Sequence, residues 1–435
     1  MHATVVGGGL AGCEAAWAMA ERGIAVTLYE MRPLRMTPAH RTDLLAEIVC
    51  SNTFKSLELT NAHGLLKAEL RLLGSLLLDV ADEARIPGGA ALTVDRQVFS
   101  REVTRRLAAH AGIEIVQEEV TGLPSPGVIA TGPLTSDGLA ARLRERLGTE
   151  SLAFYDAIAP IVDGESLDHA AFYRMSRYGK GGGEDFLNAP LSHEAYEAFV
   201  DALLSADQHV PHEFDAVPYF EGCLPVEEMA RRGRETLRFG PLKPVGLPDP
   251  RTGKEPYAVV QLRREDRAGQ MWNLVGFQTR LRIPEQQRVF MRLPGLGSAE
   301  FHRFGSVHRN TYLNTPAALT PHLSTLDDPR LLFAGQLVGV EGYTESLASG
   351  LLAALNLVRL LHGREPRVPP PDTMLGALIR YVHGCDPRHF QPMNANFGLL
   401  PPLGQTVRDK CRKRALLSER ALAAMRRFAG EVATI

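Results

Sequence analysis

The chain opens with Ala3-Thr4-Val5-Val6-Gly7-Gly8-Gly9-Leu10-Ala11-Gly12, and this stretch decides the fold. An apolar strand leads into G-x-G-x-x-G, and the apolar pattern predicts a helix over 13–22. In such a turn Gly7 permits the sharp bend, Gly9 lets the backbone approach a pyrophosphate, and Gly12 lets the helix pack on the strand. The pyrophosphate sits at the positive end of the helix. The stretch therefore predicts a dinucleotide site in an α/β, Rossmann-like domain.

The next strand strengthens this interpretation. Residues 24–29 are apolar and end on Glu30, at the position where an acid accepts a ribose hydroxyl. A glycine-rich turn in an ordinary α/β sheet is the plainer alternative, but here strand, helix, second strand and acid are all present. The motif leaves FAD and NAD both open. The cofactor-binding residues predicted from it are Gly7, Gly8, Gly9, Leu10, Ala11, Gly12 and Glu30.

Two later segments favour FAD. Residues 127–132 form a strand that ends in Ala-Thr-Gly, and a similar segment returns the chain to the nucleotide in two-dinucleotide-type flavoproteins. Residues 331–336 form another apolar strand ending in glycine, which leads to a long apolar helix expected over 346–361. The N-terminus of such a helix can stabilise negative charge on reduced flavin. These segments, with the strand expected over 113–120, add further predicted cofactor residues: Val120, Thr131, Gly132, Gly335, Gln336, Gly342 and Tyr343.

The length of 435 residues allows two or three domains, and 45% apolar residues allow a sizeable core. We predict the first part of an FAD-binding domain over 1–150 and an inserted α+β domain over 151–324. The insertion has short strands, such as 258–262, and turns rich in glycine and proline. Residues 325–435 are expected to complete the FAD-binding domain and to add a helical C-terminal tail.

The ends and the apolar runs of the chain predict its compartment. The start runs directly into a strand and lacks the regions of a signal peptide. No apolar run has the length needed to span a bilayer. We therefore expect a soluble, cytoplasmic protein that does not associate with a membrane.

The formal net charge is only -2, so global charge gives no indication of a nucleic-acid partner. The basic residues are nevertheless grouped, in segments 231–238, 263–267 and 280–292 and in the tail over 408–414. A solvated surface is the simplest interpretation of any one group. Together the groups could form a basic surface for phosphate contacts. The sequence does not predict the oligomeric state.

The chain has five cysteines, an odd number, and none lies in a C-x-x-C pair. This argues against a disulfide framework and against a metal site. Cys50 opens a polar segment, and Cys223 lies in the turn over 220–225. From spacing alone each is more simply a small buried residue than a catalytic one. The tract over 178–183 lacks the ending of a Walker A loop, and a mobile surface loop and a lid over the flavin both remain open for it.

The chain resembles, from end to end, the folate- and FAD-dependent tRNA (uracil-5-)-methyltransferases, the TrmFO family. The related GidA/MnmG wobble-uridine enzymes share the flavin motifs, but they are longer. The turn around Cys223, the segment from Asn394 and the chain length favour the TrmFO family. The resemblance is carried by residues 5–16, 29–33, 49–52, 179–183, 221–225, 333–336, 339–346 and 394–401.

The resemblance implies methylation of C5 of the T-loop uridine in tRNA. The carbon donor would be methylenetetrahydrofolate, and reduced FAD, supplied by NADH or NADPH, would be the reductant. The family has two active cysteines, which match Cys50 and Cys223. A thiolate that adds to uracil C6 makes C5 nucleophilic. We assign this addition to Cys223 and the proton at C5 to Cys50, and the reverse assignment stays open.

Other functions are compatible with the residues alone. An NAD(P)H-dependent flavin oxidoreductase of a small molecule would use the same dinucleotide site, and its arginine groups would be incidental. A GidA-like wobble-uridine protein, or an RNA-binding factor that keeps FAD for structure, would also fit. Salt-dependent tRNA binding and methyl transfer to tRNA separate these possibilities.

Overall fold

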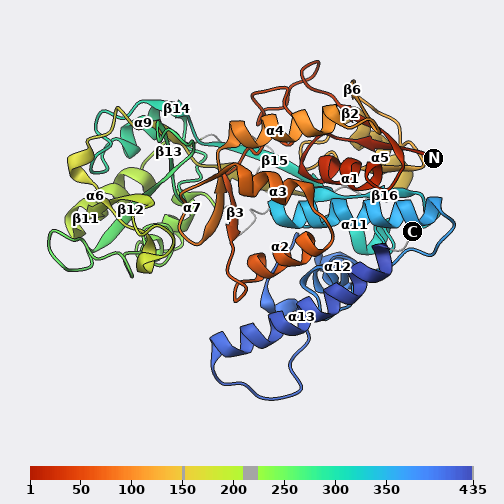
Figure 1. The fold of residues 1–435 in the computed structure, drawn as a ribbon. Coiled ribbons are helices and arrows are strands. Elements are labelled where there is room, and N and C mark those ends of the chain that lie inside the picture. The colour runs from red at the N-terminus through yellow and green to blue at the C-terminus, as the bar shows by residue number, and fades with distance from the viewer. Residues whose placement is uncertain (149–151, 209–223, 434–435) are drawn as a thin grey trace.

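The protein was analysed as a computed structural model that describes residues 1–148, 152–208 and 224–433 (Figure 1). Its first sheet has five strands in the order β16-β7-β1-β2-β6, and every pairing in it is parallel. The strands are β1 (His2–Val6), β2 (Ala25–Glu30), β6 (Ile113–Gln117), β7 (Gly127–Ile129) and β16 (Leu331–Phe333). This parallel sheet confirms the predicted Rossmann-like α/β fold.

Two helices cross closely above this sheet. They are α1 (Leu10–Ala20) and α11 (Tyr343–Leu361), and a Cβ atom on Gly350 would lie 2.2 Å from the carbonyl oxygen of Ala11. Both helices begin three residues earlier than predicted, because the glycine before each one is its N-cap and the chain turns helical immediately. The strand predicted over 113–120 ends at Gln117, because its partner β2 ends at Glu30.

Further helices and a small antiparallel sheet surround the parallel sheet. The carboxylates of Glu14 and Glu69 are buried beneath the starts of two of these helices. Glu14 accepts from the amide of Leu77 at 3.0 Å, and Glu69 accepts from the amide of Met374 at 2.7 Å. The helices are α2 (Ala62–Leu72), α3 (Leu76–Glu83), α4 (Arg96–Ala109), α5 (Asp137–Leu147), α10 (Thr315–Ala318), α12 (Met374–Gly384) and α13 (Lys410–Ala433), and the strands are β3 (Thr53–Ser56), β4 (Arg85–Ile86) and β5 (Ala91–Val94).

The parallel sheet and the elements around it form a first body. A second sheet of six strands, the centre of the second body, lies beside it in the order β10-β11-β12-β13-β9-β14 (Figure 1). Helices cover one face of it, and their apolar side chains form a second core with residues such as Leu262 and Trp272. The strands are β9 (Ile161–Asp163), β10 (Tyr173–Arg174), β11 (Phe186–Leu191), β12 (Ala258–Arg264), β13 (Met271–Leu274) and β14 (Phe301–Arg303). The helices are α6 (His193–Leu204), α7 (Val226–Arg231), α8 (Thr236–Phe239) and α9 (Ile283–Phe290).

The chain passes between the two bodies through an antiparallel pair, β8 (Leu152–Ile158) and β15 (Ser306–Tyr312). The second core lies within residues 162–299, and the first core draws on residues both before and after it. Tyr312 and Leu323 already belong to the first core. The boundaries 1–150, 151–324 and 325–435 stay a prediction.

The tail helix α13 packs against α2 and extends away from the parallel sheet (Figure 1). Among the described residues, α11 is the one helix that is long and apolar enough to cross a membrane. Its apolar window is 89% buried within the fold. Such burial is typical of the core helix of a folded domain.

Candidate active site

A cavity with about 1030 Å³ of empty space opens at the carboxyl ends of β1, β2 and β7. Ligands of open α/β sheets bind at this edge. Every predicted cofactor residue lines the cavity except Gly12 and Gly342. The lining residues from the prediction are Gly7, Gly8, Gly9, Leu10, Ala11, Glu30, Val120, Thr131, Gly132, Gly335, Gln336 and Tyr343.

The three motif glycines differ in what surrounds them. Gly7 has φ +106°, and a Cβ atom there would lie 2.6 Å from the carbonyl oxygen of Ala130. A Cβ atom on Gly12 would lie 1.8 Å from the carbonyl oxygen of Gly7. Gly12 therefore lets helix α1 pack closely against the turn at Gly7. Around Gly9 no described atom lies within 4 Å of that position. The open space beside Gly9 is therefore available to a ligand.

Two helix N-termini border this space without a side-chain cap. Helix α1 starts after Gly9, and α11 starts after Gly342, whose φ of +119° suits only glycine. The first residues of both helices line the cavity. Uncapped amides and the positive ends of the helix dipoles both attract anions. The cavity thus offers two separate positions for negative charge.

Glu30 supplies a carboxylate to the wall of the cavity. The amide of Gly8 donates to its Oε2 at 3.0 Å, and Arg32 donates to both oxygens, Nε to Oε1 at 3.0 Å and Nη2 to Oε2 at 3.2 Å. Burial alone would raise the pKa of Glu30, but Arg32 and the Gly8 amide outweigh it and hold this pKa below its ordinary value. The carboxylate is ionised and accepts hydrogen bonds only.

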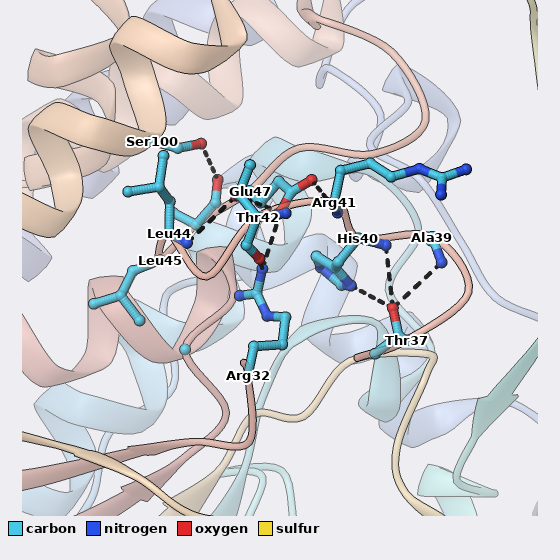
Figure 2. Close-up of polar contacts among 12 residues, drawn as sticks. Arg32, Thr37, Ala39, His40, Arg41, Thr42, Leu44, Leu45, Glu47 and Ser100 are labelled. Carbon is cyan, nitrogen blue, oxygen red and sulfur yellow. Dashed lines mark hydrogen bonds and ion pairs between the residues drawn. The ribbon is translucent and has the colours of Figure 1, made fainter. Parts of the chain in front are cut away.

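Figure 2 shows the loop that follows β2 and closes one side of the cavity. Arg32, buried at the start of the loop, also donates from Nη1 to Glu47 at 3.1 Å and to the Thr42 carbonyl at 3.1 Å. The hydroxyl of Thr42 donates to the carboxylate of Glu47 at 2.7 Å. His40 lies 2.6 Å from the Thr37 hydroxyl, and burial lowers the pKa of His40 to about 4. Its imidazole is therefore neutral at physiological pH.

Cys50 is half-buried at the rim of the cavity, next to the lining residue Val49. Tyr343 connects the Cys50 backbone to the cavity wall. Its hydroxyl accepts from the amide of Cys50 at 2.9 Å and from that of Ser51 at 3.0 Å. Tyr343 is also the first residue of α11 and lines the cavity. The helix that borders the cavity thus fixes the backbone that carries the thiol.

Arginines hold the same loop from the other side. Arg96 donates from Nη1 to the carbonyls of Ile48 at 3.0 Å and Val49 at 3.1 Å. Arg303 donates to the same Val49 carbonyl at 2.9 Å. Arg96 also pairs with buried Glu265 at 2.5 Å, which links the loop to the second sheet. Sequence reasoning missed Arg96 and Arg303, because no local motif marks them.

Cys223, the other predicted catalytic residue, lies outside the described residues, so its role stays a prediction. Cys13 is buried in α1, and its thiol donates to the Gly8 carbonyl at 3.2 Å. Burial raises the pKa of Cys13, which is a packing residue. No group of three or more His, Cys, Asp or Glu residues suited to a metal ion is found in the described part of the chain.

The glycine tract after Tyr178 lies against the turn at Gly89. Asp185, just beyond the tract, accepts from the Gly89 amide at 2.7 Å, and Lys180 pairs with Glu58 at 2.5 Å. The tract does not line the cavity. In this structure it joins the two bodies.

The basic groups of the sequence fall into two kinds. In the second body Arg234, Arg238 and Arg288 pair with acidic side chains of their own surface. In the tail, by contrast, no ion pair is found within the described residues for Arg408, Lys410, Arg412, Lys413 or Arg414. Within the described residues, the tail group therefore keeps charge for a partner, and Arg282 and Arg292 of the second body also make no ion pair there.

The family model for glucose inhibited division protein A, GIDA, matches residues 2–365. Methylenetetrahydrofolate–tRNA-(uracil-5-)-methyltransferase TrmFO of Geobacter sulfurreducens is 60% identical over 422 residues, which cover 97% of each chain. The proteins of the same name from Geotalea daltonii and Moorella thermoacetica are 54% and 55% identical, over 98% and 96% of each chain.

Among solved structures, GidA of Aquifex aeolicus matches with a TM-score of 0.71 at 16% identity. The match covers 100% of this chain and 74% of that chain, and it supports the fold alone. At these identities and coverages, the chain belongs to the GidA family and, within it, to the TrmFO group.

Proposed function

We propose that this chain methylates C5 of the T-loop uridine in tRNA, with methylenetetrahydrofolate as the carbon donor. The observation that carries the proposal is the position of Cys50, which Tyr343 holds at the rim of a dinucleotide cavity. A flavin oxidoreductase of a small molecule would not need a thiol there. Relatives at 54–60% identity bear the name of this methyltransferase, which supports it further.

The cavity fits FAD. Its pyrophosphate would lie at the start of α1 beside Gly9, its ribose hydroxyl at Glu30, and its flavin ring toward Gly335, Gln336 and Tyr343. When bound, FAD supplies the reducing equivalents that turn a methylene carbon into a methyl group. We assign the supply of these equivalents to NADH or NADPH. Gly12 and Gly342 would shape the site from outside the lining.

The cysteines provide the covalent chemistry at the base. A thiolate adds to uracil C6 and leaves C5 as a nucleophile, and a second group removes the C5 proton. We assign the addition to Cys223 and the proton to Cys50, with the reverse as the alternative. The arginine side chains that hold residues 48 and 49 place positive charge near the Cys50 sulfur.

The tail supplies the proposed contacts to RNA. Arg412, Lys413 and Arg414 lie at the start of α13 without ion pairs among the described residues, which suits them to phosphate contacts. A reaction on tRNA would place the protein in the cytoplasm.

The test compares the wild type with Cys50→Ala, Cys223→Ala and, as a control, Cys411→Ala at an exposed cysteine. Three quantities are measured: bound FAD, label transferred from methylenetetrahydrofolate to a tRNA transcript, and covalent adduct with 5-fluorouridine tRNA. We expect all variants to keep FAD, and only Cys411→Ala to keep transfer. Full transfer by Cys50→Ala would contradict the proposal. An adduct with Cys223→Ala but none with Cys50→Ala would reverse the two roles.

A further inference from the structure

The second sheet turns a buried polar face toward the Cys50 loop. Asn188 pairs directly with Gln261, and Arg263 pairs directly with Asn273, so within each pair the side chains lie on the same face. Gln261 and Arg263 are two apart on β12, which puts all four on one face. All four are buried, and the opposite face of the strand, with Leu262, packs on the second core. A polar face that is buried needs partners.

This polar face meets the residues on both sides of Cys50. Arg263 donates from Nε to Asn52 Oδ1 at 2.9 Å, two residues after the cysteine. Arg303 of β14, the edge strand of the same sheet, donates to the carbonyl of Val49, the residue before the cysteine, at 2.9 Å. Asn52 in turn donates to the Arg264 carbonyl at 2.9 Å. The sheet and the loop therefore form one hydrogen-bonded unit around the thiol.

Arg263 has hydrogen-bonding capacity left in this unit. Its residue is only 9% exposed, and Nη1 and Nη2 have no acceptor in the described part of the chain. Burial lowers the pKa of Arg263, while the neighbouring Glu265 acts to raise it. An arginine nevertheless keeps its charge in proteins. Nη1 and Nη2 are not among the fully buried unpaired side-chain atoms of the described residues, so these two groups can donate to a bound molecule.

We propose that Arg263 is a further catalytic residue, which donates from its terminal amino groups to the C4 oxygen of the target uracil. The inference rests on the proposed function. Uracil C4 and C5 are bonded to each other, as are C5 and C6. C5 is the atom from which Cys50 would remove the proton. A donor beside Cys50 can therefore reach the C4 oxygen whichever cysteine adds to C6.

The contact would strengthen as the reaction proceeds. When the thiolate adds, the S–C6 bond forms and the C5=C6 π bond breaks. Its electron pair moves toward C4, and the C4 oxygen takes the negative charge as an enolate. No proton moves in this step. A buried, preorganised cation at that oxygen stabilises the transition state more than the neutral base.

The first measurement is the rate of methyl transfer by Arg263→Gln and Arg263→Lys. We expect Arg263→Gln to lower kcat by about 10²–10³-fold, the usual effect of losing one oxyanion donor. Bound FAD and the KM for methylenetetrahydrofolate should stay unchanged. Arg263→Lys, which keeps the charge but loses the forked geometry, should recover part of the rate. The control is Arg264→Gln on the opposite face, where Arg264 lies 5.4 Å from the centre of the Trp272 ring, and it should keep the wild-type rate.

The second measurement separates contact with the base from a purely structural role. With 4-thiouridine at the target position, sulfur replaces the oxygen and accepts hydrogen bonds poorly. The wild type should slow on this substrate, whereas Arg263→Gln should transfer methyl to both substrates at the same low rate. Three results would overturn the inference. Arg263→Gln could keep the full rate, it could be slowed by 4-thiouridine as much as the wild type is, or it could change only the KM for the folate. A wild type that transfers no methyl to tRNA would contradict the proposed function as well.

Discussion

Arg32 is the residue on which the wall of the cavity most depends for stability. It is 1% exposed and donates to two carboxylates, Glu30 at 3.0 Å and Glu47 at 3.1 Å. Arg32→Met keeps much of the side-chain volume but leaves both acids without their cation. Breaking a buried pair in this way costs about 3–5 kcal/mol. We expect a loss of that size in the free energy of unfolding, together with a loss of bound FAD.

The assay is urea unfolding of the FAD-free protein, followed by far-UV circular dichroism. The matched control is Arg71→Met, whose partner Asp82 is at 2.7 Å and whose own side chain is 33% exposed. An exposed pair contributes at most about 1 kcal/mol. Adding Glu47→Gln to Arg32→Met should restore part of the stability, because one unpaired charge is removed. If Arg32→Met were as stable as Arg71→Met, the reasoning from burial would be refuted.

The pH dependence of the same variant gives a second check. In the wild type the pKa of Glu30 is below its ordinary value, so its contribution is present at neutral pH and is lost as the pH falls through that lowered pKa. In Arg32→Met burial should instead raise this pKa. The stability deficit of the variant should therefore shrink on acidification. A stability deficit that does not change with pH would show that the loss in Arg32→Met does not come from the unpaired Glu30.

Three further predictions follow from particular contacts. Gly9→Val should fold but fail to retain FAD, since no described atom lies within 4 Å of its Cβ position, whereas Gly12→Val should fail to fold, with its Cβ 1.8 Å from a carbonyl oxygen; soluble yield and flavin absorbance distinguish the two. Reversing the charges over 412–414 should weaken tRNA binding and flatten its dependence on salt, and the same change at the paired Arg105 should not. Burial raises the pKa of Glu69 to about 8, so the native state retains a proton that the unfolded chain loses, and stability should fall as the pH rises from 4.5 to 8. Glu69→Gln should remove that slope in unfolding curves, and an unchanged slope would exclude Glu69 as its source.

The part of the fold that is encoded locally could be predicted from the sequence. The strand, glycine turn and helix at the start of the chain have periodicities and turn residues that act over a few positions. The same holds for the strand that ends before Gly335. The helices α1 and α11 each start three residues before the predicted position, because each begins directly after a glycine N-cap.

The surroundings of the thiol could not be predicted in the same way. Arg263 and Asn52 are 211 residues apart in the chain, and Arg96 and Glu265 are 169 apart. Each of these arginines resembles any other charged residue until the two bodies come together. The polar face of β12 is also invisible locally, because its alternation of apolar and polar residues is typical of a strand with one face in solvent.

The most direct test of the central claim is mass spectrometry of a tRNA transcript incubated with the FAD-loaded protein, NADPH and ¹³C-labelled methylenetetrahydrofolate. After nuclease digestion, the account predicts one labelled methyl group on the uridine of the T-loop fragment, and none on the anticodon fragment. The same reaction with Cys50→Ala should leave the transcript unchanged. A transcript without label after reaction with the reduced wild type, or label at the wobble uridine instead, would contradict the account.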